Sequence, residues 1–150
     1  MLATGERQSG RGANQIGNLQ RAGATRWSSH YESVKSMIDM YGASCEVVED
    51  LKKSANPQIR GQAFGVFKVM RSFDFAFILN LMNNIMRITD TLCQALQRKS
   101  QDIVNAMKLV STTKNLLQEF RENGWDNFLA HVLLFCTRNN IDILNMSFSF

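Results

Sequence analysis

Apolar residues recur at steps of three and four positions through most of the chain after residue 28, and this spacing places them on one face of an α-helix. The first such stretch runs from Ser29 to Tyr41 and carries Tyr31, Val34, Met37, Ile38 and Tyr41. Gly42 is expected to interrupt or kink this helix, because glycine weakens helix interiors. A second apolar set continues the pattern as far as the lysine pair 52–53 and consists of Cys45, Val48 and Leu51.

The next helix start is marked by Asn56 and Pro57. Asparagine caps the free N–H groups of a helix start, and proline suits the first helical position because its missing N–H costs nothing there. The apolar residues of this predicted helix are Ile59, Ala63, Phe67 and Met70. Gly61 and Gly65 lie one turn apart on it, and we expect them to let another helix of the chain approach closely.

The stretch from Ser72 to Met86 is the most hydrophobic part of the chain. A helix that is apolar nearly all round must be covered on most sides, so we predict that it forms the centre of the fold. Thr89 or Asp90 is expected to cap a new segment after it. That segment carries a heptad row, which predicts long antiparallel packing or a coiled coil and consists of Leu96, Ile103, Val110 and Leu117.

Gly124 is expected to end that segment as a left-handed C-cap. A last amphipathic helix is predicted over Trp125 to Thr137, closed by the asparagine pair 139–140. The tail from Ile141 to Phe150 alternates apolar and polar residues only weakly and is expected to hang loose or to dock on the helices. Together these patterns predict an all-α fold, a bundle of about five to six helices.

Residues 1–24 differ from the helical domain that we predict over residues 25–150. They hold five of the nine glycines, so we expect a flexible, irregular arm whose only apolar anchors are Ile16 and Leu19. Residues 1–30 carry four arginines against one glutamate, a net charge of +3. Residues 31–150 carry thirteen basic and twelve acidic side chains, a net charge of +1. A basic arm suits contact with phosphates, although a bias of this size is also typical of a merely solvated segment.

Composition narrows the class of protein. An apolar fraction of 45% in 150 residues is enough for a core, and a single proline favours long helices over a sheet. Cys45, Cys93 and Cys136 lie more than forty positions apart, which indicates reduced thiols in an intracellular compartment. The sequence begins with no secretion signal and has no apolar run long enough to span a membrane, so we expect a soluble protein without a membrane partner.

No catalytic motif can be assembled from the sequence, so we expect no enzyme activity, cofactor or small-molecule substrate. His30 and His131 have no neighbouring ligand pattern, which argues against a metal site. The acidic residues Glu46, Glu49 and Asp50 could bind Mg²⁺, but beside two lysines they are more typical of a solvated helix face.

One short stretch joins the arm to the helices and holds the pair Arg26 and Trp27. Ser29 followed by Glu32 has the form of a capping box, which places the pair in the turn just ahead of a helix N-terminus. There the guanidinium could hold a phosphate and the indole could stack on a base. The alternative is that Trp27 packs as a hydrophobic staple on Ile38 or another apolar residue.

Three segments carry a resemblance to a known family. They are GANQIGNLQRAGATRWSSH over residues 12–30, LCQALQRKSQDIV over residues 92–104 and GWD over residues 124–126. They resemble plant hAT-superfamily transposase-like proteins, of the kind described as zinc finger MYM-type protein 1-like, and the likeness extends over nearly the whole chain. In that family an RNase H-like core with three catalytic acids is interrupted by a large all-helical insertion.

The resemblance implies that residues 25–150 correspond to the insertion domain and that Arg26 and Trp27 contact DNA at the transposon end. With them we assign Arg21 and His30 to the same predicted DNA-contacting surface. The sequence lacks the strands that carry the first two acids in the family, and it ends before the position of the third. Ala24 stands where the family usually has an acidic residue, and Leu144 stands where it usually has a proline.

The resemblance therefore predicts a truncated, catalytically inactive product of a domesticated or decayed transposase. Its residual function would be DNA contact in the nucleus, with the cytoplasm as the other possible location. The alternative that the residues themselves suggest is a helical protein–protein interaction module. In that case the seam from Leu96 to Leu117 would pair with a protein partner or with a second copy.

Overall fold

The computed structural model describes residues 27–98 and 102–143. This part of the chain contains six α-helices and no strand, so the predicted all-α class is confirmed. The helices are α1 (Trp27–Asp39), α2 (Tyr41–Leu51), α3 (Pro57–Met70), α4 (Phe73–Leu96), α5 (Ile103–Asn123) and α6 (Trp125–Arg138). None of the described helices is both long enough and apolar enough to cross a membrane.

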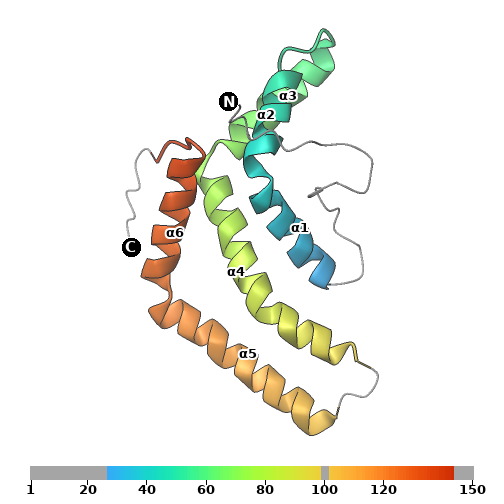
Figure 1. The fold of residues 1–150 in the computed structure, drawn as a ribbon, viewed down its shortest axis with the longest axis vertical. Helices are drawn as coiled ribbons and strands as arrows, with labels where there is room; N and C mark the ends of the chain where they lie inside the picture. The colour runs from blue at the N-terminus through green and yellow to red at the C-terminus, as the bar shows by residue number, and fades with distance from the viewer. Residues whose placement is uncertain (1–26, 99–101, 144–150) are drawn as a thin grey trace, which may run out of the picture.

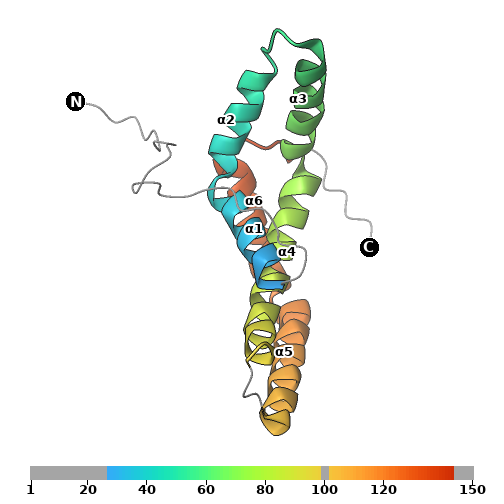
Figure 2. The same ribbon diagram turned by 90° about the vertical axis from the view of Figure 1, so that its right-hand side faces the viewer.

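Helix α4 is the central element, with α1 along one side and α6 along the other (Figure 1). At one end of the molecule α2 and α3 lie side by side as an antiparallel pair. At the other end the last part of α4 pairs with α5 (Figure 2). The molecule is therefore elongated, with a three-helix middle and a helical hairpin projecting from each end.

The core lies where α1, α2, α4 and α6 meet. Tyr41 is 1% exposed and sets its ring edge-on against Phe135, with centroids 4.9 Å apart, while its hydroxyl donates a hydrogen bond to the backbone oxygen of Met70. Around this ring the core is formed by Cys45, Ala76, Leu79, Phe128, Val132, Cys136 and Ile141. The central position predicted for the Ser72–Met86 stretch is confirmed, although Ile78 on its outer side is 54% exposed.

The first break in the helices lies two residues earlier than expected. Helix α1 ends at Asp39 and α2 begins at Tyr41, so the turn falls at Met40 and Gly42 lies inside α2. The expected interruption at Gly42 is wrong. The chain changes direction where Tyr41 has to enter the core, and glycine there needs no special conformation.

The start of α3 follows the sequence prediction. The side-chain oxygen of Asn56 accepts from the backbone N–H of Gln58 at 2.9 Å and of Ile59 at 3.4 Å, with Pro57 in the first helical position. The packing expected at Gly61 and Gly65 is wrong, because a Cβ built at either position meets nothing within 4 Å. Helix α2 packs against α3, whose buried residues are Ala63 and Met70.

The helix cap expected at Thr89 or Asp90 is also wrong. Helix α4 continues through both residues to Leu96, and the next helix begins only at Ile103. The Thr89 hydroxyl donates to the Ile85 backbone oxygen at 3.0 Å, one turn back, so this polar side chain is satisfied inside the helix.

The junction between α5 and α6 is Gly124, and its φ of −91° is right-handed, which overturns the predicted left-handed cap. The left-handed residue is instead Asn140, with a φ of 52°, just after α6. The backbone N–H of Ile141 then donates to the Cys136 oxygen at 2.9 Å, and the Ile141 side chain is buried. The start of the tail thus docks on the bundle, whereas residues 144–150 lie outside the described residues.

Candidate functional site

The predicted DNA-contacting surface lies at the beginning of α1. Trp27 is the first described residue of that helix, and Ser29 already lies within it, so the capping box and the position of Trp27 ahead of the helix are wrong. The indole Nε1 donates a hydrogen bond to Thr89 Oγ1 on α4, at 2.8 Å. Trp27 therefore reaches across to α4, while Ile38 lies three turns further along α1, about 16 Å away.

Of the four residues assigned to DNA, the structure describes two. Trp27 is 41% exposed and His30 is half-buried on the next turn of α1. Three positions apart on a helix, they are neighbours on its surface. Arg21 and Arg26 lie outside the described residues, so the proposed guanidinium contacts stay a prediction.

The residue that follows the indole's hydrogen-bond partner along α4 is acidic. Asp90, which follows Thr89 on α4, is only 8% exposed. Its Oδ2 accepts a hydrogen bond from Gln94 Nε2 at 2.6 Å, while Oδ1 has no hydrogen-bond partner among the described residues. Burying a polar oxygen without a hydrogen-bond donor is costly. At this end of α1 the structure thus shows an exposed aromatic side chain, while the arginines assigned with it lie outside the described residues.

A second candidate surface runs along α5. Ile103, Met107 and Val110 lie on one face of the helix and are 76%, 69% and 49% exposed. We call these three residues the α5 stripe. Helix α4 packs against a neighbouring face of α5, which carries the buried Thr113.

The α5 stripe includes two members of the predicted heptad seam. A third member, Leu96 at the end of α4, is 48% exposed, and only Leu117 is half-buried. Antiparallel packing of α4 and α5 does occur, but it leaves three of the four seam residues exposed, so the seam is not the surface on which these two helices pack. Pairing of the seam with a partner stays a prediction.

Two basic residues extend the line of the α5 stripe toward the end of the helix. Lys114 follows Val110 by four positions, and Arg121 follows Lys114 by seven. No acidic residue stands three or four positions from either of them. Within the described ranges the ion pairs join only Glu49 to Lys52 and Asp50 to Lys53, so Lys114 and Arg121 have no compensating carboxylate there.

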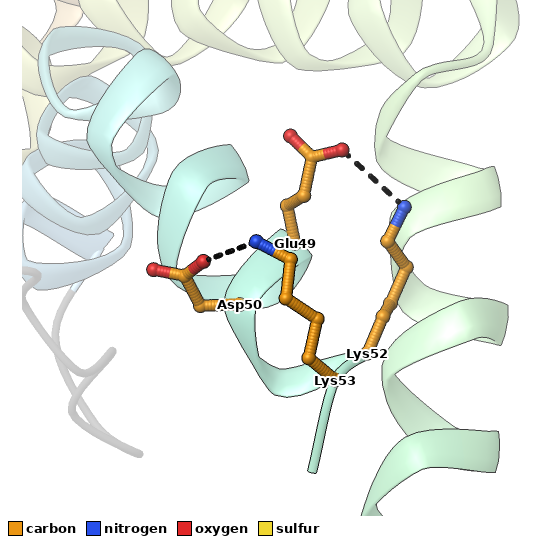
Figure 3. A network of polar contacts seen from close by, with 4 residues as sticks. All are labelled: Glu49, Asp50, Lys52 and Lys53. Carbon is orange, nitrogen blue, oxygen red and sulfur yellow. Dashed lines mark hydrogen bonds and ion pairs between the residues drawn. The ribbon is translucent and has the colours of Figure 1, made fainter.

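Two of the three acidic residues on α2, Glu49 and Asp50, form these two ion pairs. Lys52 Nζ lies 3.5 Å from a Glu49 oxygen, and Lys53 Nζ lies 3.0 Å from an Asp50 oxygen (Figure 3). Lys52 Nζ also lies 3.7 Å from the centre of the Phe67 ring, so it bridges α2 and α3. Within the described ranges, no three His, Cys, Asp or Glu side chains gather as a metal would require. The arrangement fits the solvated face that the sequence left as the alternative to Mg²⁺ binding.

The cysteines offer little reactivity. All three are free thiols, with Cys45 and Cys136 buried and Cys93 half-buried. Burial raises the pKa of each thiol above its ordinary value, and for Cys93 the nearby Asp90 carboxylate adds to the effect. Because the thiolate is the nucleophile, a raised pKa lowers the reactivity of all three thiols, and Cys45 and Cys136 serve as core residues.

A groove of about 510 Å³ separates α4 from α5 near the start of α6. Its apolar lining comes from Ile88, Leu92, Leu109, Leu116 and Phe120. Arg87 and Glu119 contribute charges at its sides, but the lining residues include no His or Cys and no serine that could serve as a nucleophile. The groove is therefore a gap between diverging helices and shows no arrangement suited to catalysis.

No family model, no curated protein and no solved structure matches this chain. The resemblance to hAT-type transposases therefore rests on the quoted sequence segments alone. The function has to be argued from the exposed surfaces of the helices.

Proposed function

We propose that this chain is a non-enzymatic helical module that binds another protein through the α5 stripe. The observation that carries the proposal is the exposure of Ile103, Met107 and Val110 in one row. Single exposed apolar residues are common on protein surfaces, whereas contiguous rows of them mark interaction sites. Burying such side chains against a partner removes apolar surface from water, which favours association.

The spacing of the α5 stripe supports a helical partner. Its residues stand at positions i, i+4 and i+7, which is the set of anchors by which an amphipathic helix packs into a groove or against another helix. The hairpin of α4 and α5 projects from the middle of the molecule, so a partner can reach it without displacing the core (Figure 2). The proposal requires no reaction, cofactor or metal.

We also propose that the module descends from the insertion domain of an hAT-type transposase and works in the nucleus. The sequence segments that resemble this family support the descent. The all-helical fold of the described residues agrees with it, since the family's insertion is helical throughout.

Site-specific photo-cross-linking in cells tests the protein-binding proposal. A benzophenone side chain at Met107 is expected to give one discrete adduct of higher mass. The matched control carries the same group at Thr112, which is also exposed but lies away from the α5 stripe, where α5 borders the groove toward α4. The adduct should disappear when Val110 is changed to glutamate. Equal labelling from positions 107 and 112, or none from 107, would contradict the proposal.

The exposed indole of Trp27 supports a second candidate, contact with DNA. The ring is 41% exposed although its Nε1 is held by Thr89, so it is already oriented when a base arrives. Arg21, Arg26 and His30 would join it on this proposal. The test is Trp27 fluorescence in a Trp125→Phe variant during titration with DNA hairpins at low salt. Quenching that salt reverses is expected, and an unchanged spectrum would rule this candidate out.

A further inference from the structure

We infer that the partner of the α5 stripe is an amphipathic helix that carries acidic residues at one end. The inference rests on the protein-binding function proposed above and adds the chemistry of the partner. Its basis is the line formed by the α5 stripe together with Lys114 and Arg121. Ile103, Met107 and Val110 give this line an exposed apolar half. The other half is basic.

The length of this line defines the partner. The rise of an α-helix is 1.5 Å per residue, so the line from Ile103 to Arg121 is about 27 Å long. A partner helix that covers this line needs apolar residues at positions i, i+3 or i+4 and i+7. Carboxylates must follow on the same face, one to three turns beyond the last apolar residue. The partner is therefore apolar along one part of its contact face and acidic along the other.

The charges of the basic half have no compensation within the described part of the chain. The acids of α5 are Glu119 and Glu122, and they accept hydrogen bonds from Asn123 and Gln118 on their own helix. Lys114 and Arg121 can lay their apolar stems beside a docked helix while their charged ends meet carboxylates. Such rim pairs add modest affinity and set the orientation of the partner.

The same charges argue against a second copy of this chain. An antiparallel pair of α5 helices that packs Met107 on Val110 would place Lys114 against Ile103 of the other copy. A parallel pair would place Lys114 against its own counterpart. Either arrangement buries an ammonium group without a carboxylate, which is costly. A helix with acids at the matching positions avoids this cost.

Peptide binding to the full chain tests the inference. Three helical peptides share one apolar face and differ only in carrying Glu, Gln or Lys at the positions that would meet Lys114 and Arg121. Each is made with these positions at either end, so that both orientations are sampled. We expect the Glu peptide to bind roughly tenfold more tightly than the Gln peptide at low salt, with the difference shrinking at high salt.

Variants of the chain separate the inference from the function on which it rests. A Lys114→Glu, Arg121→Glu chain should prefer the Lys peptide. A chain with serine at Ile103, Met107 and Val110 should lose all three peptides. The matched control replaces Val66 and Val69 on α3, which are 49% and 57% exposed, with serine and should bind as the original does. Circular dichroism verifies that each variant is folded.

Each outcome decides one of the two claims. Equal affinity for all three peptides would overturn the acidic partner and leave the protein-binding function standing. If no peptide bound, or if the serine variant of the α5 stripe bound as well as the original chain, both the acidic partner and the protein-binding function would be contradicted. A doubling of mass in sedimentation that the serine variant abolishes would replace the acidic helix by a second copy.

Discussion

Trp27 and Thr89 are 62 positions apart in the chain, yet the indole Nε1 of one donates a hydrogen bond to the hydroxyl oxygen of the other at 2.8 Å. The bond joins the beginning of α1 to the second half of α4. It fixes the orientation of the exposed indole, on which the DNA candidate depends.

Replacing Thr89 with valine is expected to lower the free energy of unfolding by about 0.5–1.5 kcal/mol. The change keeps the shape of the side chain but removes the acceptor of the indole N–H. Urea unfolding followed by circular dichroism measures the loss, and Trp27 emission in a Trp125→Phe background reports the released ring. The control is Thr112→Val, because Thr112 makes only a local bond to the Lys108 backbone. Equal losses in the two variants would show that the cross-helix bond contributes nothing.

Because of the buried hydroxyl of Tyr41, we expect the free energy of unfolding to decline at alkaline pH. Burial, together with the neighbouring Cys45, raises the pKa of its hydroxyl far above the ordinary value of 10.0. The folded chain therefore keeps this proton where the unfolded chain has lost it, and the unfolded state is favoured as pH rises. The contribution of Tyr41 is fully present below about pH 10 and declines above it.

The measurement is the urea midpoint from pH 7 to 11, comparing the original chain with Tyr41→Phe. At neutral pH the variant should be less stable by about 1–2 kcal/mol, because the Met70 oxygen loses its hydrogen bond. Above pH 10 its midpoint should fall less steeply than that of the original. Parallel curves would contradict the assignment to Tyr41. The buried thiols titrate in the same direction and remain in both proteins.

The sequence predicted the elements that local chemistry determines. Asn56 and Pro57 set the start of α3 through their own backbone and side chains, and the apolar run after Ser72 required a covered helix. Position in the fold was harder to predict. Thr89 resembled a helix cap, although its hydroxyl is satisfied one turn back in the helix and by Trp27, and no short-range pattern encodes that distant partner.

The candidate surface on α5 could be predicted from the sequence only in part. A heptad row at Ile103 and Val110 indicates that something packs there, but the spacing is the same for an internal helix and for another molecule. Only the fold shows that α4 covers a different face. The basic continuation through Lys114 and Arg121 was present in the sequence and becomes informative once that line is known to be exposed.

The glycines give a matched pair of opposite predictions. Gly61→Ala and Gly65→Ala should each raise the free energy of unfolding by about 0.5–1 kcal/mol, because both lie inside α3 with open space around the added Cβ. Gly124→Ala should lower it, since a Cβ there would stand 2.9 Å from the Phe120 backbone oxygen and from a carbon of its ring. Thermal and urea unfolding of the three variants measures these changes. If helix propensity alone decided the result, all three substitutions would change the free energy of unfolding in the same direction.

Arg71 holds the end of α6 to the junction of α3 and α4. Its guanidinium donates to the backbone oxygen of Asn139 at 3.0 Å and to that of Asn140, just where the chain turns left-handed. Lysine cannot reproduce this fork, so Arg71→Lys is expected to lower the free energy of unfolding by about 1–3 kcal/mol. The control is Arg60→Lys, because Arg60 makes a single exposed bond to the Ser54 backbone oxygen. Urea unfolding compares the two, and faster amide exchange at Ile141 in the Arg71 variant would locate the loss at the end of α6. If both variants unfolded alike and Ile141 kept its protection, the guanidinium bridge would not be what holds the start of the tail against the core.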